Sequence, residues 1–172
     1  PMLKAIQVVG VDNSLKFLKS LGFSHLDDEK DNNIGIALGG LTNGATPLEM
    51  AAAYGAIAND GVYIEPTFYT KVVDGNGNTV FEPKQESRTV MSASAAYVVK
   101  EILTQPVKSG TSTTLAMSGM SVAAKTGTTN DDYDRWMCGF TPYYSAAVWY
   151  GYDKSETVSG WSLSPAGQIW SG

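Results

Sequence analysis

Lys125-Thr126-Gly127-Thr128-Thr129 is a short stretch in which one ammonium group and several hydroxyls surround a glycine. Because successive side chains of a strand point to opposite faces, Lys125 and Gly127 should share one face, and the two threonines beside them the other. A peptide that pairs with the edge of such a strand would meet these hydroxyls next to main-chain hydrogen-bonding groups. The stretch therefore predicts a surface that binds an anionic peptide end carrying a reacting acyl group. Taken alone, the tripeptide is also typical of a strand end that runs into a glycine turn.

The composition limits the class of protein and its partners. The chain has 172 residues, of which 43% are hydrophobic, enough for the core of one domain. Its net charge of -5 and its lack of a Lys/Arg run argue against nucleic acid or an anionic membrane surface as a partner. Cys138 is the single cysteine, so we expect a small buried side chain and no internal disulfide. No apolar stretch has the length of a membrane-spanning helix.

Capping signals predict four helices. The first two should cover residues 2–9 and 12–21, with Asp12 as the N-cap of the second and Gly22 at its end. Thr46-Pro47-Leu48-Glu49 is a capping box with proline at the first helical position, and the helix it starts should continue through Ile57. The fourth helix should begin at Ser92 or Ser94 and run to about Thr104.

Two groups of strands are predicted. Residues 68–73 and 79–81 should form a hairpin around a turn at 74–78, whose Asp/Asn spacing lacks the glycine and glutamate of a calcium loop. Residues 121–126, 135–140 and 145–152 should form an antiparallel group that opens with the Lys-Thr-Gly strand. The expected fold is α+β, with an antiparallel sheet flanked by helices.

Two longer stretches resemble one known family. Residues 44–54, followed by Ala58-Asn59-Asp60-Gly61, resemble a helix of the penicillin-binding protein transpeptidase domain, most closely of the bifunctional class A type. The Lys-Thr-Gly stretch, followed by Asp134-Arg135-Trp136 and residues 139–142, resembles the third catalytic motif of that family and the strands after it. The similarity covers almost the whole chain in the right order.

The resemblance implies acyl transfer through a serine. In this family a serine of a Ser-x-x-Lys motif attacks the penultimate D-alanine carbonyl of a peptidoglycan stem peptide, and an amine of a neighbouring stem then takes the acyl group. β-Lactam antibiotics acylate the same serine. No Ser-x-x-Lys or Ser-x-Asn occurs here, and the nearest candidate, Ser94-Ala95-Ala96-Tyr97, ends in tyrosine. We therefore expect residues 1–172 to be the C-terminal portion of one transpeptidase domain, starting just after the Ser-x-Asn motif, with the nucleophile upstream of Pro1.

The resemblance also implies roles for the strand. Lys125 would place a positive charge beside the serines of the missing part, and Thr126 and Thr128 would bind the substrate carboxylate. The backbone N–H of Thr128 would contribute to the oxyanion hole, while Gly127 would keep the strand edge open. No cofactor and no metal are implied. The implied partners are the N-terminal part of the same domain, stem peptides and β-lactams, at the extracytoplasmic face of the bacterial membrane, with an anchor outside this chain.

Other interpretations stay open at this point. A D,D-carboxypeptidase or β-lactam sensor on the same fold, or a non-catalytic peptidoglycan-binding module, would share the strand. His25 should be solvated or a cap, with no serine or carboxylate arranged around it, and Asp131, Asp132 and Asp134 should form a solvated loop. Without its partner segment the chain should expose apolar helix faces.

Overall fold

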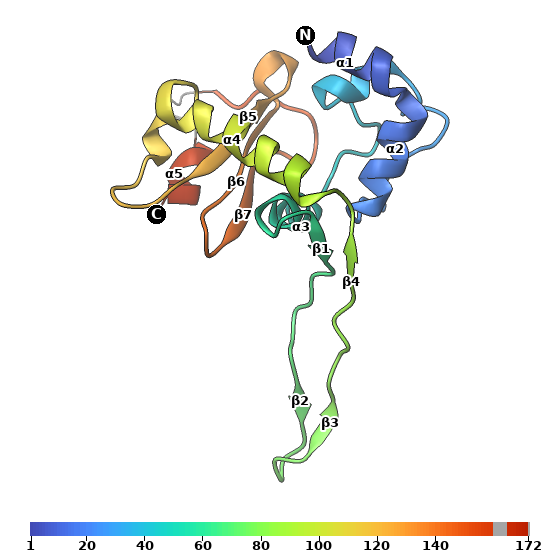
Figure 1. Cartoon of the computed structure of the whole chain (residues 1–172), viewed down its shortest axis with the longest axis vertical. Coiled ribbons are helices and arrows are strands. Elements are labelled where there is room, and N and C mark those ends of the chain that lie inside the picture. The colour runs from blue at the N-terminus through green and yellow to red at the C-terminus, as the bar shows by residue number, and fades with distance from the viewer. Residues whose placement is uncertain (160–164, 172) are drawn as a thin grey trace.

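The computed structural model describes residues 1–159 and 165–171 of the chain. Figure 1 shows a body of helices and a small sheet, from which a narrow two-stranded arm extends. The α-helices of the described part are α1 (Met2–Val9), α2 (Val11–Ser20), α3 (Pro47–Ala58), α4 (Ala93–Ser109) and α5 (Pro165–Ser171). Its strands are β1 (Val62–Ile64), β2 (Val72–Val73), β3 (Thr79–Phe81), β4 (Ser87–Thr89), β5 (Ala123–Thr128), β6 (Asp134–Phe140) and β7 (Ser145–Gly151). Its short 3₁₀ helices are η1 (Ile34–Leu38), η2 (Thr113–Leu115) and η3 (Asn130–Asp132).

The helix predicted over residues 2–9 is confirmed as α1, and the predicted caps of α3 and α4 are confirmed as well. At α3 the hydroxyl of Thr46 accepts a hydrogen bond from the Glu49 N–H, and the Glu49 carboxylate accepts one from the Thr46 N–H, which completes the capping box. At α4 the Ser92 hydroxyl accepts from the Ala95 N–H. The helix then continues past Thr104 and ends at Ser109, five residues beyond the expected position.

The predicted cap of α2 is wrong. The helix begins at Val11, and its N-cap is Gly10, which has φ of 89° and no capping side chain. Only a glycine adopts this backbone conformation readily, so the chain turns from α1 directly into α2. Asp12 therefore lies in the first helical turn, where a carboxylate favours the positive end of the helix dipole.

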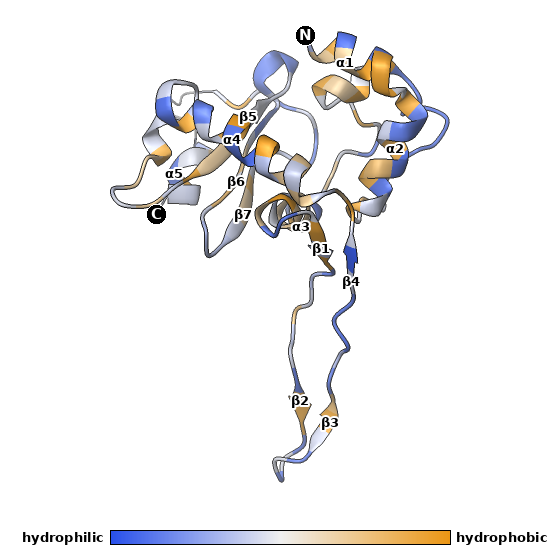
Figure 2. Ribbon diagram, viewed as in Figure 1, coloured by the Kyte–Doolittle hydropathy of each residue, from blue (hydrophilic) through white to orange (hydrophobic). Residues whose placement is uncertain are grey.

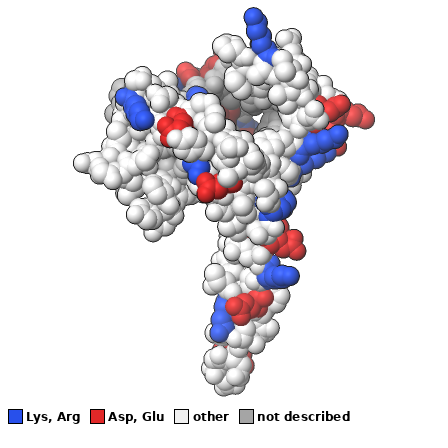
Figure 3. Space-filling model, viewed as in Figure 1, with Lys and Arg blue, Asp and Glu red and all other residues white. Residues whose placement is uncertain are grey.

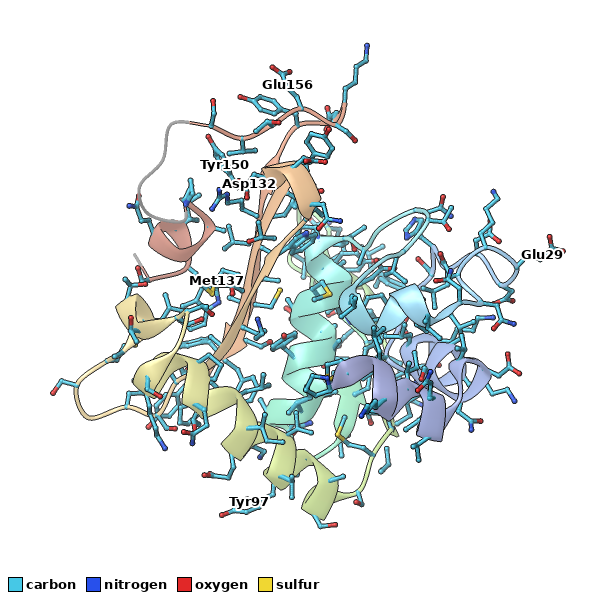
Figure 4. The ribbon with its side chains drawn as sticks, turned by 90° about the horizontal axis from the view of Figure 1, so that it is seen from above. Glu29, Tyr97, Asp132, Met137, Tyr150 and Glu156 are labelled. Atoms are coloured by element: carbon cyan, nitrogen blue, oxygen red, sulfur yellow. The ribbon has the colours of Figure 1, made fainter. Side chains whose placement is uncertain are left out.

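The central sheet confirms the expected antiparallel group. Its strand order is β5-β6-β7, and Lys125 lies opposite Cys138 while Thr128 lies opposite Arg135. Seen from above, the sheet stands on edge between α3 and α5, with Met137 toward the α5 side (Figure 4). Among the described strands, β5 pairs only with β6, so the Lys-Thr-Gly strand forms an edge of the sheet.

Two apolar clusters hold the body together. One lies between the sheet, α4, η2 and α5, and it consists of Val107, Leu115, Val122, Ala124, Met137 and Ala166. The other joins α2, α3 and β1, and it consists of Leu21, Phe23, Ala53, Ala56 and Tyr63. Because the first cluster includes residues of β5 and β6, it fixes the covered side of the Lys-Thr-Gly strand.

The arm differs in part from the predicted hairpin. The turn forms as expected, since the Asp74 carboxylate accepts hydrogen bonds from the Asn76 and Asn78 N–H groups. The first strand is much shorter than residues 68–73, and only Val72–Val73 pairs with β3. The pairing of β1 with β4 at the base of the arm was not predicted. Apolar residues nevertheless colour both strands near the tip (Figure 2), and they are exposed.

Candidate functional site

The hydrogen bonds of β5 orient its backbone. The Thr129 N–H donates to the Asp134 carbonyl at 3.2 Å, immediately beyond the pair formed by Thr128 and Arg135. In an antiparallel ladder, hydrogen-bonded pairs alternate with pairs that are not hydrogen-bonded. The N–H and C=O groups of Thr128 and Thr126 therefore point away from β6, toward the edge of the sheet that no described strand covers.

The two faces of β5 carry different chemistry, as the alternation predicts. Lys125 and Gly127 lie on the face that includes Cys138 and Phe140, and Phe140 contacts Tyr54 of α3 with ring centroids 6.5 Å apart. Thr126 and Thr128 lie on the face that includes Met137, which packs against α4, η2 and α5. The ammonium group and the hydroxyls thus reach the strand edge from opposite sides of the sheet.

Lys125 is exposed, and its Nζ donates a hydrogen bond to the Thr126 carbonyl at 2.9 Å. That carbonyl is one of the groups that point to the free edge. Two hollows of the described surface lie elsewhere, one between α3 and β1 and the other between α1, α2 and η1. The candidate site is therefore the edge of β5 that pairs with no described strand, with the Lys125 side chain lying along it.

Gly127 has a packing reason to be glycine. It lies opposite Trp136, and a Cβ at this position would be 3.1 Å from the Trp136 Cβ. This separation is tighter than ordinary van der Waals contact, so any larger residue would displace the tryptophan or the strand. The absence of a side chain keeps β5 and β6 in register at the site.

Asp134 fixes the end of the strand. Its carboxylate accepts hydrogen bonds from the Trp149 Nε1–H at 2.8 Å and from the Thr129 hydroxyl at 3.3 Å, and its N–H donates to that hydroxyl at 2.8 Å. Asp132 pairs with Arg135 at 3.1 Å. Asp132 and Asp134 therefore make structural contacts and are not simply solvated. The described residues contain no cluster of acidic, His or Cys side chains suited to a metal.

His25 lies in surroundings that the sequence did not predict. Its Nδ1 is 3.1 Å from the Ser24 hydroxyl and 3.2 Å from Glu49 Oε1, so a serine and a carboxylate do surround it. In a serine-type catalytic triad the serine and the carboxylate contact different ring nitrogens. Here both contact Nδ1, and the carboxylate is engaged by backbone groups, so the cluster has a structural role.

A hydroxyl from outside the strand also contacts the site. Thr111, in the loop between α4 and η2, has its Oγ1 3.0 Å from Thr126 Oγ1. No motif marks this residue, because the two threonines are 15 positions apart and meet only through tertiary packing. Figure 3 shows acidic and basic side chains interspersed over the visible face.

Comparisons with known proteins agree with this geometry. The family model described as "Penicillin binding protein transpeptidase domain" matches residues 2–171. The chain belongs to this family of penicillin-binding protein transpeptidase domains, as the sequence motifs predicted.

Among curated relatives, "Penicillin-binding protein 1A" of Clostridium botulinum (strain Langeland) is 40% identical over 169 residues, which are 98% of this chain and 20% of that protein. "Penicillin-binding protein 1A/1B" of Bacillus subtilis is 36% identical, with 91% of this chain and 18% of that protein covered. The chain thus spans about a fifth of the length of these relatives.

Solved structures show the same fold. The PonA1 protein from Mycobacterium tuberculosis in complex with penicillin V matches with a TM-score of 0.80 and 27% identity, covering 94% of this chain and 48% of that one. Penicillin-binding protein 1A from Haemophilus influenzae matches with a TM-score of 0.77 and 25% identity, covering 96% and 30%. Within the described residues, no helix is both long and apolar enough to cross a bilayer.

Proposed function

We propose that the chain is part of a serine D,D-transpeptidase that cross-links peptidoglycan stem peptides and is acylated by β-lactams. Family membership and a relative solved with penicillin V support this reaction class. The observation that carries the proposal is the orientation of β5, because the Thr128 N–H is directed to a strand edge with which no described strand pairs and which an acyl donor can approach.

Each residue of the strand then has a role. The Lys125 ammonium attracts the substrate carboxylate and assists proton transfer at the serine. The hydroxyls of Thr126 and Thr128 donate hydrogen bonds to that carboxylate. Because the acceptor is charged, these bonds are stronger than hydrogen bonds between neutral groups. The Thr128 N–H stabilises the oxyanion, a contribution worth about 2.7 to 4 kcal/mol per donor. Gly127 preserves the close pairing with Trp136.

The nucleophile belongs to another part of the domain in this proposal. The 172 residues contain no Ser-x-x-Lys and no Ser-x-Asn, so another segment must supply these motifs. In the complete site, the serine of that segment and the strand β5 lie on either side of the reacting carbonyl. We infer that residues 1–172 form one portion of a single transpeptidase domain. Because cross-linked wall lies outside the cytoplasmic membrane, the domain acts on the extracytoplasmic side in this proposal.

The role of Lys125 is tested in a polypeptide that joins residues 1–172 to the segment with the Ser-x-x-Lys motif, called the reconstituted domain below. Acylation by a fluorescent penicillin should be about a hundredfold or more slower in Lys125→Ala, the lower range for loss of an acid–base group. The control is Lys108→Ala in the last turn of α4, which should react like the wild type. Equal acylation of Lys125→Ala and wild type would contradict the role.

A donor and an acceptor then separate the related activities. The reconstituted domain is supplied with a stem-peptide donor ending in D-Ala-D-Ala and with an amine acceptor. A transpeptidase partitions toward the amide, whereas a carboxypeptidase yields only the shortened peptide. A non-catalytic module would give neither product and would form no covalent adduct with penicillin.

A further inference from the structure

The contact between Thr111 and Thr126 joins two segments that the proposed mechanism does not otherwise connect. Their hydroxyl oxygens are 3.0 Å apart, within hydrogen-bonding distance, and either can be the donor. Thr126 belongs to the strand that binds the ligand, whereas Thr111 is exposed in the loop that follows α4.

The loop that carries Thr111 is held firmly on both sides. The N–H groups of Gly110 and Ser112 both donate to the Pro106 carbonyl at 3.0 Å. A Cβ on Gly110 would lie 2.7 Å from the Pro106 Cα, so the chain passes too close to the helix for any other residue. Ser112 is fully buried, with its hydroxyl 4.0 Å from the Met137 sulfur. Thr111 is therefore placed by its neighbours rather than by its own contact with Thr126.

The number of hydrogens determines what the pair can do. Each threonine hydroxyl has one hydrogen to donate and lone pairs to accept with. When Thr126 donates its only hydrogen to a carboxylate, its oxygen is left to accept, and Thr111 is in position to donate to it. Hydrogen bonds in such a chain polarise one another, which strengthens the bond to the anion. Without Thr111, the Thr126 hydroxyl is free to rotate.

We propose that Thr111 is a positioning residue that donates to Thr126 and so directs the Thr126 O–H toward the carboxylate of the bound ligand. This inference rests on the function proposed above. It adds to the Lys-Thr-Gly strand a hydroxyl that lies outside every motif of the sequence. Thr111 itself does not touch the ligand, and its whole effect passes through Thr126.

The test uses the reconstituted domain and the rate of acylation by benzylpenicillin, followed by competition with a fluorescent penicillin. Thr111→Val removes the hydroxyl with little change of shape and should slow acylation about three- to tenfold, the effect of losing one neutral hydrogen bond. Thr111→Ser keeps the hydroxyl and should restore most of the rate. Thr114→Val, on an exposed residue of η2, is the matched control and should react like the wild type.

A ligand without the carboxylate separates positioning from a simple structural role. The methyl ester of benzylpenicillin cannot accept the charge-assisted bond from Thr126. If Thr111 acts through that bond, Thr111→Val should be acylated by the acid more slowly than the wild type. With the ester, the variant and the wild type should be acylated at the same rate. Equal losses for acid and ester would overturn the proposal, since they would mean that the contact only ties the loop to the strand.

A double-mutant cycle supplies the second readout. In a Thr126→Val background the hydroxyl of Thr111 has no partner, so Thr111→Val should cause no further loss. Additive losses would contradict the proposal, as would wild-type acylation of Thr111→Val itself. Thr111→Ala serves if the valine variant unfolds at a lower temperature. Failure of the proposed function is recognised separately, because in that case the wild-type domain would form no adduct with either penicillin.

Discussion

Glu49 is the residue whose contacts most exceed what its motif indicates. Its side chain is nearly buried, and its Oε1 accepts hydrogen bonds from the N–H and the hydroxyl of Ser24, at 2.8 and 2.9 Å. Its Oε2 accepts from the N–H and the hydroxyl of Thr46, at 2.8 and 3.0 Å. Burial by itself would raise the pKa of the carboxyl, but these hydrogen bonds outweigh it and lower the pKa from 4.5 to about 2.

This pKa predicts how stability depends on pH. Because the folded pKa lies below the unfolded one, the stabilisation is complete above pH 4.5 and is lost as the pH falls toward 2. The shift corresponds to about 3 kcal/mol at neutral pH. Glu49→Gln should therefore lower the free energy of unfolding by about 2 to 3 kcal/mol at pH 7 and much less near pH 2. Urea unfolding of the reconstituted domain at several pH values measures the difference.

The matched control for Glu49 is Glu29, which projects from the loop after α2 (Figure 4). Glu29→Gln should change the free energy of unfolding by no more than about 0.5 kcal/mol, as surface substitutions usually do. A Glu49→Gln variant whose deficit stayed constant down to pH 2 would disprove the assignment of the stabilisation to the charged carboxylate.

At the scale of single residues, the sequence predicts contacts that are local and misses those that are not. The capping box between Thr46 and Glu49 spans four positions and is confirmed in full. The bonds from Ser24 to the same carboxylate join positions 25 apart, and no local pattern signals them. The contact of Thr111 with Thr126 was missed for the same reason. Roles assigned to the Lys-Thr-Gly residues remain predictions, since they concern a ligand.

Among the elements, the arm is the one least attached to the body. Its base is fixed by Arg88, whose guanidinium lies 4.3 Å from the centre of the Tyr63 ring and whose Nε–H donates to the Ser20 carbonyl at 2.8 Å. Farther out, the arm contacts itself, as in the ring pair of Tyr69 and Phe81 with centroids 5.9 Å apart. The picture of a narrow ribbon leaving the body agrees with these contacts (Figure 1).

Shortening the arm should therefore leave the body folded. Replacing residues 67–84 by a two-residue turn removes no contact with either apolar cluster and shortens the loop to be closed, which is worth about 0.6 kcal/mol per halving of loop length. The thermal midpoint of the reconstituted domain should stay the same or rise slightly. The contrasting variant is Arg88→Ala, which removes both contacts at the base and should lower the midpoint. A large loss on shortening would show that the arm stabilises the body.

Helices and strands are predicted correctly where a clear periodic pattern of apolar residues extends over many positions. The three strands of the sheet and the four predicted helices are present, with the largest error at the end of α4. There the chain continues helical beyond Pro106, because Val107 packs in the apolar cluster with Leu115 and Met137. The strand expected over residues 68–73 is mostly irregular, since these residues stand in the arm without a sheet to cover them.

Large apolar side chains are exposed on the part of the molecule that α1 and α2 form. They include Met2, Leu3, Val8, Val9 and Phe17. The hollow between these helices and η1 is lined mainly by apolar residues. Both serine motifs are absent from the 172 residues. We propose that the segment that supplies the nucleophile packs against these exposed apolar faces.

In the function proposed above, the Lys-Thr-Gly edge of this chain acts on a serine that these 172 residues do not contain. Mass spectrometry of peptides from the acylated reconstituted domain shows which serine carries the penicilloyl adduct. The adduct should lie on the serine of the Ser-x-x-Lys motif, and the isolated chain should form none. An adduct on any serine between Pro1 and Gly172 would contradict the claim.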